Sequence, residues 1–193
     1  MDTIYVFFAD GFEETEAVTP VDILRRAGAQ VKMVSVYPQR KTVKGSHGIE
    51  IVCDMTISES HAFADTCVMI LPGGGLGVEN LKKCAALSAL LTEADKKGVM
   101  LAAICAAPTV LSDLGILRDK SATCYPSMTG ELECADIRGE AVVIDKNIIT
   151  SRGAGTAADF GFVITAEISG DKKAEDIRRA MCYPPSAPIY RVK

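Results

Sequence analysis

The sequence predicts an α/β protein in which helices cover both faces of a mostly parallel sheet. Short β-branched or apolar runs alternate with longer helical patterns along nearly the whole chain, which is typical of this class. Residues 99–104 are apolar without interruption, as expected for a central strand buried on both faces. Two strands near the C-terminus are separated by a short turn, so one antiparallel hairpin should join the parallel sheet.

In the first part of the chain, two strand patterns enclose one helical pattern. Residues 3–9 read TIYVFFA, a β-branched and aromatic run that predicts a strand. Residues 13–27 follow helical periodicity up to Gly28, a typical helix stop, and residues 30–36 predict the next strand. Pro20 lies inside this helix and has no backbone N–H to donate, so it predicts a kink or a second helix start.

The middle of the chain leads to the central strand. Residues 49–52 predict a short strand at the end of a turn-rich stretch, and residues 67–71 predict another strand. Residues 81–97 predict one amphipathic helix that ends at Gly98, immediately before the apolar run 99–104.

The last part of the chain combines a hairpin with three helices. A helix over residues 106–114 is stopped by Gly115. The other expected elements are strands at 121–125, 140–144 and 147–151, a turn at 145–146, and helices at 156–168 and 172–181. In sheets of this kind chemistry is found beyond the carboxyl ends of the strands, so the segments that follow the strands are the candidates for a functional site.

The composition is that of an ordinary globular protein, and one domain over residues 1–193 is expected. The 193 residues are 48% hydrophobic and 24% charged, with a formal net charge of −4. The basic residues are scattered, which argues against a nucleic-acid partner. No apolar run reaches the roughly 18 residues of a membrane span, and the first residues do not resemble a secretory signal. We therefore expect a cytoplasmic protein without a membrane partner.

The seven cysteines are expected to be free thiols in a reducing compartment. Their number is odd and no CxxC pair occurs, so a disulfide framework is not indicated. His47 and His61 are the two histidines, and no zinc-site spacing is present. Residues 153–158 match GxGxxA formally, but the second strand and the acidic residue of a dinucleotide-binding unit do not follow. Neither a metal nor a cofactor is expected.

Cys105 is the strongest candidate for a reactive group. It lies between the central strand and a helix whose start is marked by Pro108, which places its thiol on a tight turn in the manner of a nucleophile elbow. Free N–H groups at the helix start would favour the thiolate, the nucleophilic form of cysteine. The alternative is that Cys105 is a small buried residue that continues the apolar run. Its position after the strand favours a functional role.

Two further segments that follow strands could complete a site around Cys105. Glu16, in the first turn of the first helix, is the carboxyl group expected to point over the sheet edge, where burial beside a thiolate would keep it protonated. Gly73 and Gly74 follow a strand and can bring backbone N–H groups close to a reacting oxygen. Taken alone, an acidic residue at a helix start and a glycine turn can also be purely structural.

Five motifs of this chain occur together in one known family. They are FEETE at 12–16, PVDILRRAG at 20–28, LPGG at 71–74, AAICAAPT at 102–109 and TSRG at 150–153. In their order and spacing they resemble the ThiJ/PfpI superfamily, in the branch of the Parkinsonism-associated protein deglycase and its bacterial YajL-like relatives. The resemblance covers essentially the whole chain.

The resemblance implies a flavodoxin-like three-layer sandwich that forms a homodimer. It implies that Cys105 is a nucleophile and a redox-sensitive thiol, and that Glu16 is its protonated hydrogen-bond partner. The backbone amides of Gly73, Gly74 and Ala106 would form the oxyanion site. The activities that it implies are a cofactor-independent glyoxalase and a protein deglycase, with roles in oxidative stress and as a chaperone.

Three positions depart from the family pattern. Tyr125 precedes Pro126 where relatives often carry His, so a histidine proton shuttle is absent there and Tyr125 is expected to donate a hydrogen bond in its place. Ala154 stands where relatives usually have Pro, which changes the shape of the pocket. His47 lies near a position that is often Arg in relatives.

Three functions remain open. The first is an enzyme that acts on α-oxoaldehydes such as methylglyoxal, or on their adducts with amino groups, including glycated proteins; the Cys105 thiolate would attack and Glu16 would move the proton. The second is a non-catalytic redox sensor or holdase chaperone in which the same cysteine is oxidised. The third is a PfpI-type cysteine peptidase, which requires His directly after the nucleophile, where this chain has Ala106.

Overall fold

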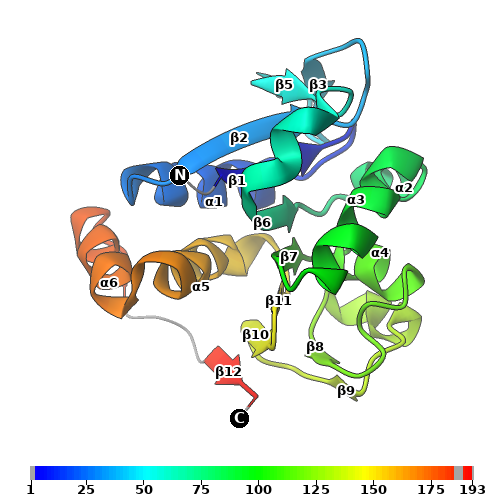
Figure 1. The fold of residues 1–193 in the computed structure, drawn as a ribbon. Coiled ribbons are helices and arrows are strands. Elements are labelled where there is room, and N and C mark those ends of the chain that lie inside the picture. The colour runs from blue at the N-terminus through cyan, green and yellow to red at the C-terminus, as the bar shows by residue number, and fades with distance from the viewer. Residues whose placement is uncertain (1–2, 185–188, 193) are drawn as a thin grey trace.

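The computed structural model describes residues 3–184 and 189–192, and its centre is a mostly parallel sheet (Figure 1). The strands of this sheet are β1 (Thr3–Phe8), β2 (Gln30–Ser35), β5 (Met55–Thr56), β6 (Thr66–Leu71), β7 (Met100–Ile104), β10 (Val142–Asp145), β11 (Ile148–Ser151) and β12 (Ile189–Arg191). Their order is β12-β10-β11-β7-β6-β1-β2-β5. Within the described residues, β10 and β11 form its antiparallel pair, which confirms the expected hairpin.

Helices cover both faces of the sheet, so the fold is the expected three-layer α/β sandwich. One layer contains α1 (Glu14–Arg26), α5 (Ala157–Ser169) and α6 (Asp171–Ala180), and the other contains α2 (Gly75–Lys82), α3 (Ala85–Lys96) and α4 (Pro108–Asp113). No helix in the described ranges is both long and apolar enough to cross a membrane.

The central strand β7 joins the two halves of the core. Ala102 and Ile104 pack with the α1 and α5 layer, whereas Leu101 and Ala103 pack with the layer of α2, α3 and α4. Successive residues of a strand point to opposite faces, so both faces of β7 are buried, as its apolar sequence indicated.

The prediction of a single helix over residues 81–97 is wrong, because the chain forms α2 and α3 with a break at Cys84. The backbone of Cys84 is extended, with φ −84° and ψ 93°. Leu81 and Leu87 are both buried against the sheet. In one straight helix, positions six residues apart are rotated by about 240°, so both side chains could not face the sheet. The break allows each helix to bury its own apolar face.

Two expected strands belong to small separate sheets rather than to the main sheet. β4 (Glu50–Val52) pairs with β3 (Thr42–Lys44), and β8 (Ser121–Ala122) pairs with β9 (Asp136–Ile137). β8 ends earlier than expected because the Thr123 N–H donates to the Thr150 hydroxyl and the Tyr125 N–H donates to Cys105. β3, β5, β9 and β12 were not expected from the sequence.

Two local expectations also need correction. α1 continues through Pro20 without a second start. The hairpin turn lies at residues 146–147, one residue later than expected, and Lys146 takes the left-handed φ of 53° there. The remaining predicted helices and strands are present with ends shifted by a few residues. The described part of the chain also contains three short 3-10 helices, η1 (Ser60–Asp65), η2 (Pro126–Glu131) and η3 (Ala154–Thr156).

Candidate active site

Cys105 lies on a strained turn between β7 and α4, which confirms the elbow expected from the sequence. Its φ is 65°, in the left-handed region that non-glycine residues rarely adopt. Its N–H donates to the Ser151 carbonyl at 2.9 Å, and its carbonyl accepts the Tyr125 N–H at 2.8 Å. Pro108 begins α4, where its missing N–H costs nothing. Bonds from two neighbouring segments therefore hold the thiol at the sheet edge.

Glu16 lies beside this thiol and is almost fully buried, with 1% of its surface exposed. It occupies the first turn of α1, where the Glu13 carboxylate caps the helix and accepts the Glu16 N–H at 2.7 Å. The Glu16 carboxyl group is hydrogen-bonded to Cys105 and accepts the Gly73 N–H at 3.0 Å. The fold therefore brings the first turn of α1 and the Cys105 turn together, although they are far apart in the sequence.

Glu16 and Cys105 form a buried pair whose titrations are coupled. Burial raises the pKa of Glu16 to about 7; its hydrogen bond with Cys105 acts in the opposite direction. Burial, together with the negative charge of Glu16, raises the pKa of the Cys105 thiol to about 12. This direction is opposite to that of the acidic thiol expected from the sequence, and part of the shift comes from the charge of Glu16. When Glu16 holds the proton, its charge no longer opposes the thiolate, although burial still does.

Backbone N–H groups converge on the sulfur from two sides. Those of Ala106 and Gly74 are hydrogen-bonded to Cys105, and both lower the pKa of its thiol. Gly74 has φ 95° and makes a close approach to Gly11 that a side chain would block. The Gly73 N–H is bound to Glu16 instead, so of the three amides expected at the oxyanion site, two face the sulfur and one holds the carboxyl group.

Ala154 has a role that the sequence did not reveal. Its backbone N–H is hydrogen-bonded to Glu16 and lowers the pKa of that carboxyl group. A proline at this position could not donate this bond. The replacement of the usual Pro therefore changes the electrostatics of Glu16 and not only the shape of the pocket.

Tyr125 lies at the rim of the site, and about half of its surface is exposed. A Cβ atom built on Gly153 would lie 3.6 Å from the Tyr125 ring, 3.8 Å from the Glu16 carboxylate and 4.0 Å from Cys105 Sγ. Gly153 therefore lies close to all three side chains. The TSRG motif after a strand was the signal for this segment, although the sequence gave no role to Gly153.

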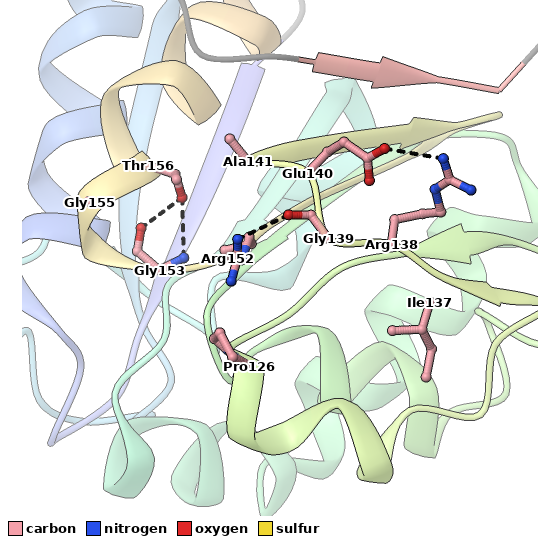
Figure 2. Close-up of a pocket in the computed structure, with 10 residues that line it drawn as sticks. All are labelled: Pro126, Ile137, Arg138, Gly139, Glu140, Ala141, Arg152, Gly153, Gly155 and Thr156. Carbon is pink, nitrogen blue, oxygen red and sulfur yellow. Dashed lines mark hydrogen bonds and ion pairs between the residues drawn. The ribbon is translucent and has the colours of Figure 1, made fainter.

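Figure 2 shows the residues that line a wide hollow of about 810 Å³, among them Gly153. Arg152 lines it and donates to a backbone carbonyl at 3.0 Å, and Arg138 pairs with Glu140 at 3.1 Å. Gly153 also lines this hollow and adjoins Cys105, which itself lies outside the lining. The hollow and the buried pair thus share one wall.

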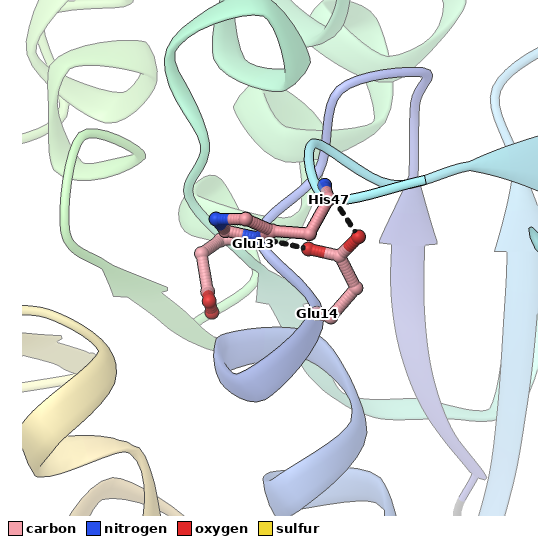
Figure 3. Close-up of side chains that lie close together, drawn as sticks. All are labelled: Glu13, Glu14 and His47. Atoms are coloured by element: carbon pink, nitrogen blue, oxygen red, sulfur yellow. Dashed lines mark hydrogen bonds and ion pairs between the residues drawn. The ribbon is translucent and has the colours of Figure 1, made fainter. Parts of the chain in front are cut away.

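Glu14 and His47 form a second bonded pair on the α1 side (Figure 3). The Glu14 carboxylate accepts the His47 backbone N–H at 2.7 Å, its ring Nδ1 at 2.8 Å and the Ser46 hydroxyl at 3.1 Å. With Glu13, these two residues form the group of potential metal ligands found among the described residues, their ligand atoms lying within 4.8 Å of one another. Glu14 and His47 already satisfy each other, so this geometry does not require a metal.

All seven cysteines are free thiols, as expected. Burial raises the pKa of Cys53 to about 12 and that of Cys124 to about 11. Among these thiols, the structure places Cys105 on the strained turn with a carboxyl group and backbone amides around its sulfur. This arrangement can support nucleophilic attack, stabilisation of an oxyanion and transfer of a proton.

Comparison with known proteins agrees with this geometry. The model of the DJ-1/PfpI family matches residues 2–167. The chain is 37% identical over 180 residues to Protein DJ-1alpha of Drosophila melanogaster, and the match covers 92% of this chain and 82% of that protein. A Caenorhabditis elegans protein named glutathione-independent glyoxalase DJR-1.2 is 31% identical over 173 residues, which cover 88% of this chain and 90% of that protein.

The solved structures lead to the same conclusion. Oxidized Toxoplasma gondii DJ-1 superposes with a TM-score of 0.90 and 33% sequence identity, and the match covers 96% of this chain and all of the other. The family model spans most of the sequence, and these Drosophila melanogaster and Caenorhabditis elegans relatives, both above 30% identity, are matched over most of their length. The chain therefore belongs to the DJ-1/PfpI family.

Proposed function

We propose that this protein is a cofactor-independent glyoxalase that uses Cys105 to convert α-oxoaldehydes such as methylglyoxal into 2-hydroxy acids. The observation that carries the proposal is the Cys105 elbow, with the Glu16 carboxyl group and the N–H groups of Gly74 and Ala106 around one sulfur. The name of the related Caenorhabditis elegans glyoxalase supports the same reaction class.

The reaction starts from thiolate at Cys105 and a proton on Glu16. The sulfur attacks the aldehyde carbon, and the N–H groups of Gly74 and Ala106 bind the oxygen that becomes negative. Glu16 gives its proton to this oxygen and so becomes the base that removes hydrogen from the former aldehyde carbon. Returning that proton to the neighbouring carbon, while the hydroxyl proton passes to the former ketone oxygen, leaves a thioester of the 2-hydroxy acid, so one carbon is oxidised and the other is reduced. Water then attacks the thioester and gives one proton to Glu16. The bond between carbon and sulfur breaks, the 2-hydroxy acid leaves, and thiolate at Cys105 and a proton on Glu16 are restored.

Larger substrates fit the same proposal. The hollow beside Gly153 offers far more room than a three-carbon aldehyde needs, so an adduct of the aldehyde with an amino group, including one on a protein, can extend into it. Deglycation of such adducts would use the same attack by Cys105. We also propose that the protein acts in the cytoplasm as a homodimer and contributes to defence against oxidative stress.

The second candidate function is a redox-sensing thiol protein with holdase activity. The specific observation that favours it is the same buried pair, since Glu16 can hydrogen-bond an oxidised Cys105, and one structural relative is described as oxidized. A peptidase reading gains no support, because Ala106 occupies the place of the required His.

The deciding experiment measures formation of lactate from methylglyoxal by the purified protein without glutathione. We expect steady turnover that is lost in Cys105→Ser and retained in Cys182→Ser, a matched change of an exposed cysteine. Turnover that survives in Cys105→Ser would contradict the mechanism. A wild-type protein that shows no turnover, but suppresses aggregation after Cys105 is oxidised, would support the redox function in its place.

A further inference from the structure

Arg152 brings to the hollow a positive charge that no carboxylate of the described chain neutralises. Arg138 also lines the hollow, but it pairs with Asp136 at 2.9 Å and with Glu140 at 3.1 Å, so its charge is balanced. The guanidinium of Arg152 donates to the Gly139 carbonyl at 3.0 Å, which uses one of its several N–H donors. The others have no partner among the described residues, so they can bind a molecule that enters the hollow.

Gly153 borders both this hollow and the reactive sulfur. It follows Arg152 in the chain and lines the hollow, and a Cβ atom built on it would lie 4.0 Å from Cys105 Sγ. Pro126, another lining residue, follows Tyr125, whose ring would lie 3.6 Å from the same Cβ atom. Figure 2 shows Arg152 and Gly153 next to each other in the lining. A group a few bonds long, on a substrate attached to the sulfur, can therefore extend toward Arg152.

This arrangement favours substrates that carry a negatively charged tail. An α-oxoaldehyde has the form R–CO–CHO, and the sulfur attacks the CHO carbon, so R is the part that is free to enter the hollow. In methylglyoxal R is a methyl group, which offers nothing to the guanidinium of Arg152. A guanidinium binds carboxylates and phosphates through paired, charge-assisted hydrogen bonds. An R group that ends in such an anion would contact Arg152 while the aldehyde reacts at Cys105.

We propose that Arg152 is a specificity-determining residue and that the hollow binds the anionic tail, a carboxylate or a phosphate, of α-oxoaldehyde substrates. The covalent steps are those of the proposed glyoxalase reaction: the bond between carbon and sulfur forms and breaks at Cys105, and water is the other reactant. The product is a 2-hydroxy acid that keeps its anionic tail. The inference rests on the proposed function, because it names the substrate class of that same site.

The test compares three substituted glyoxals, in which R is carboxyethyl, phosphooxymethyl or butyl. The first two carry an anion and so distinguish a carboxylate from a phosphate, whereas butyl is a neutral group of similar length. For each substrate kcat/KM is measured from the hydroxy acid formed, by mass spectrometry. In the wild type, kcat/KM for at least one anionic substrate should exceed that for butylglyoxal by about 10- to 100-fold, the range expected for hydrogen bonds to a charged group.

Arg152→Gln is the matched variant, because glutamine keeps an N–H donor for the Gly139 carbonyl but has no charge. The ratio of kcat/KM for the anionic substrate to that for butylglyoxal should fall to near unity. A general loss of activity lowers both values alike and so does not change this ratio. Arg152→Lys keeps the charge without the planar fork and should retain part of the ratio. Added salt should lower the ratio in the wild type but not in Arg152→Gln, a response that a purely structural Arg152 would not produce.

Arg179→Gln is the control for the loss of an exposed arginine, because this residue lies on α6 and outside the lining of the hollow. It should keep the wild-type kcat/KM for all three substrates. A wild-type ratio near unity for both anionic substrates, or a ratio that Arg152→Gln leaves unchanged, would overturn this inference alone. A wild-type protein that turns over none of these glyoxals, methylglyoxal included, would overturn the proposed function and this inference with it.

Discussion

Replacing Ala154 with Pro removes one hydrogen bond to Glu16 and little else. Ala154 begins η3, a position that suits the fixed φ of proline. The residue before it, Gly153, has an extended backbone with φ 161° and ψ −170°, which a following proline requires. The substitution should therefore fold normally and delete only the N–H that Ala154 donates to the carboxyl group.

The size of the effect follows from the strength of that bond. A hydrogen bond to a charged group contributes about 1.5 to 3 kcal/mol, and about 1.4 kcal/mol corresponds to one pKa unit. Ala154 contributes less than the bonds from Cys105 and Gly73, so the lower end of this range applies. We expect the pKa of Glu16 to rise by about one unit, from about 7 in the wild type.

The assay follows the carboxyl group directly. Infrared difference spectra against Glu16→Gln isolate the C=O band of protonated Glu16, and its loss with pH gives the pKa in each variant. Ala154→Ser keeps the backbone N–H and should titrate like the wild type. Because Glu16 stays protonated to higher pH in Ala154→Pro, iodoacetamide should also alkylate Cys105 faster than in the wild type around pH 8. A Glu16 pKa that does not move in Ala154→Pro would refute the assigned hydrogen bond.

Three further predictions test the same site. The pKa of Glu16 in the folded state, about 7, lies above the ordinary value of 4.5, so the folded state holds this proton to higher pH than the unfolded chain does. The free energy of unfolding should therefore fall by about 3 kcal/mol between pH 4.5 and 7, and Glu16→Gln should remove that slope in urea titrations. Gly73→Ala would place a Cβ 2.6 Å from Cys105 Cβ and should destabilise the folded protein by about 1 to 3 kcal/mol in thermal unfolding. The control Gly75→Ala would place a Cβ with no neighbour within 4 Å, so its free energy of unfolding should be nearly that of the wild type. Under mild peroxide, peptide mass spectrometry should find Cys105 oxidised before Cys53 and Cys124, which burial keeps protonated without a partner acid; earlier oxidation of either would contradict this order.

The sequence predicts the main sheet well because each strand carries its own local signal. β7 is apolar on both faces, and Gly28 and Gly98 lie where helices end. The break at Cys84 could not be predicted from local patterns, because it depends on the packing of both Leu81 and Leu87 against the sheet. Very short strands such as β5 and β9 could not be predicted either, because their pairing is set by tertiary contacts.

The candidate site also combines residues that local sequence features predict with contacts that only the folded chain shows. Cys105 and Glu16 could be found because a strand-to-helix turn and a helix start are local features of the sequence. The Gly73 N–H was expected to face the reacting oxygen, but it binds Glu16, and no local pattern determines which acceptor a turn amide meets. The bond between Glu14 and His47 joins residues 33 positions apart through the β3 and β4 hairpin, a contact that exists only in the folded chain.

The coupling of Glu16 to Cys105 explains why one site can serve both proposed functions. With the proton on Glu16, the sulfur is the better nucleophile, and the same proton is then in place for the oxygen of a bound aldehyde. When Glu16 is ionised, its charge and burial hold Cys105 as a thiol, which is poor at attacking either an aldehyde or a peroxide. Catalysis and oxidation should therefore change together in any variant that moves the proton between Glu16 and Cys105. The position of one proton, set by Gly73, Ala154 and Glu13 around a buried carboxyl group, controls both chemistries.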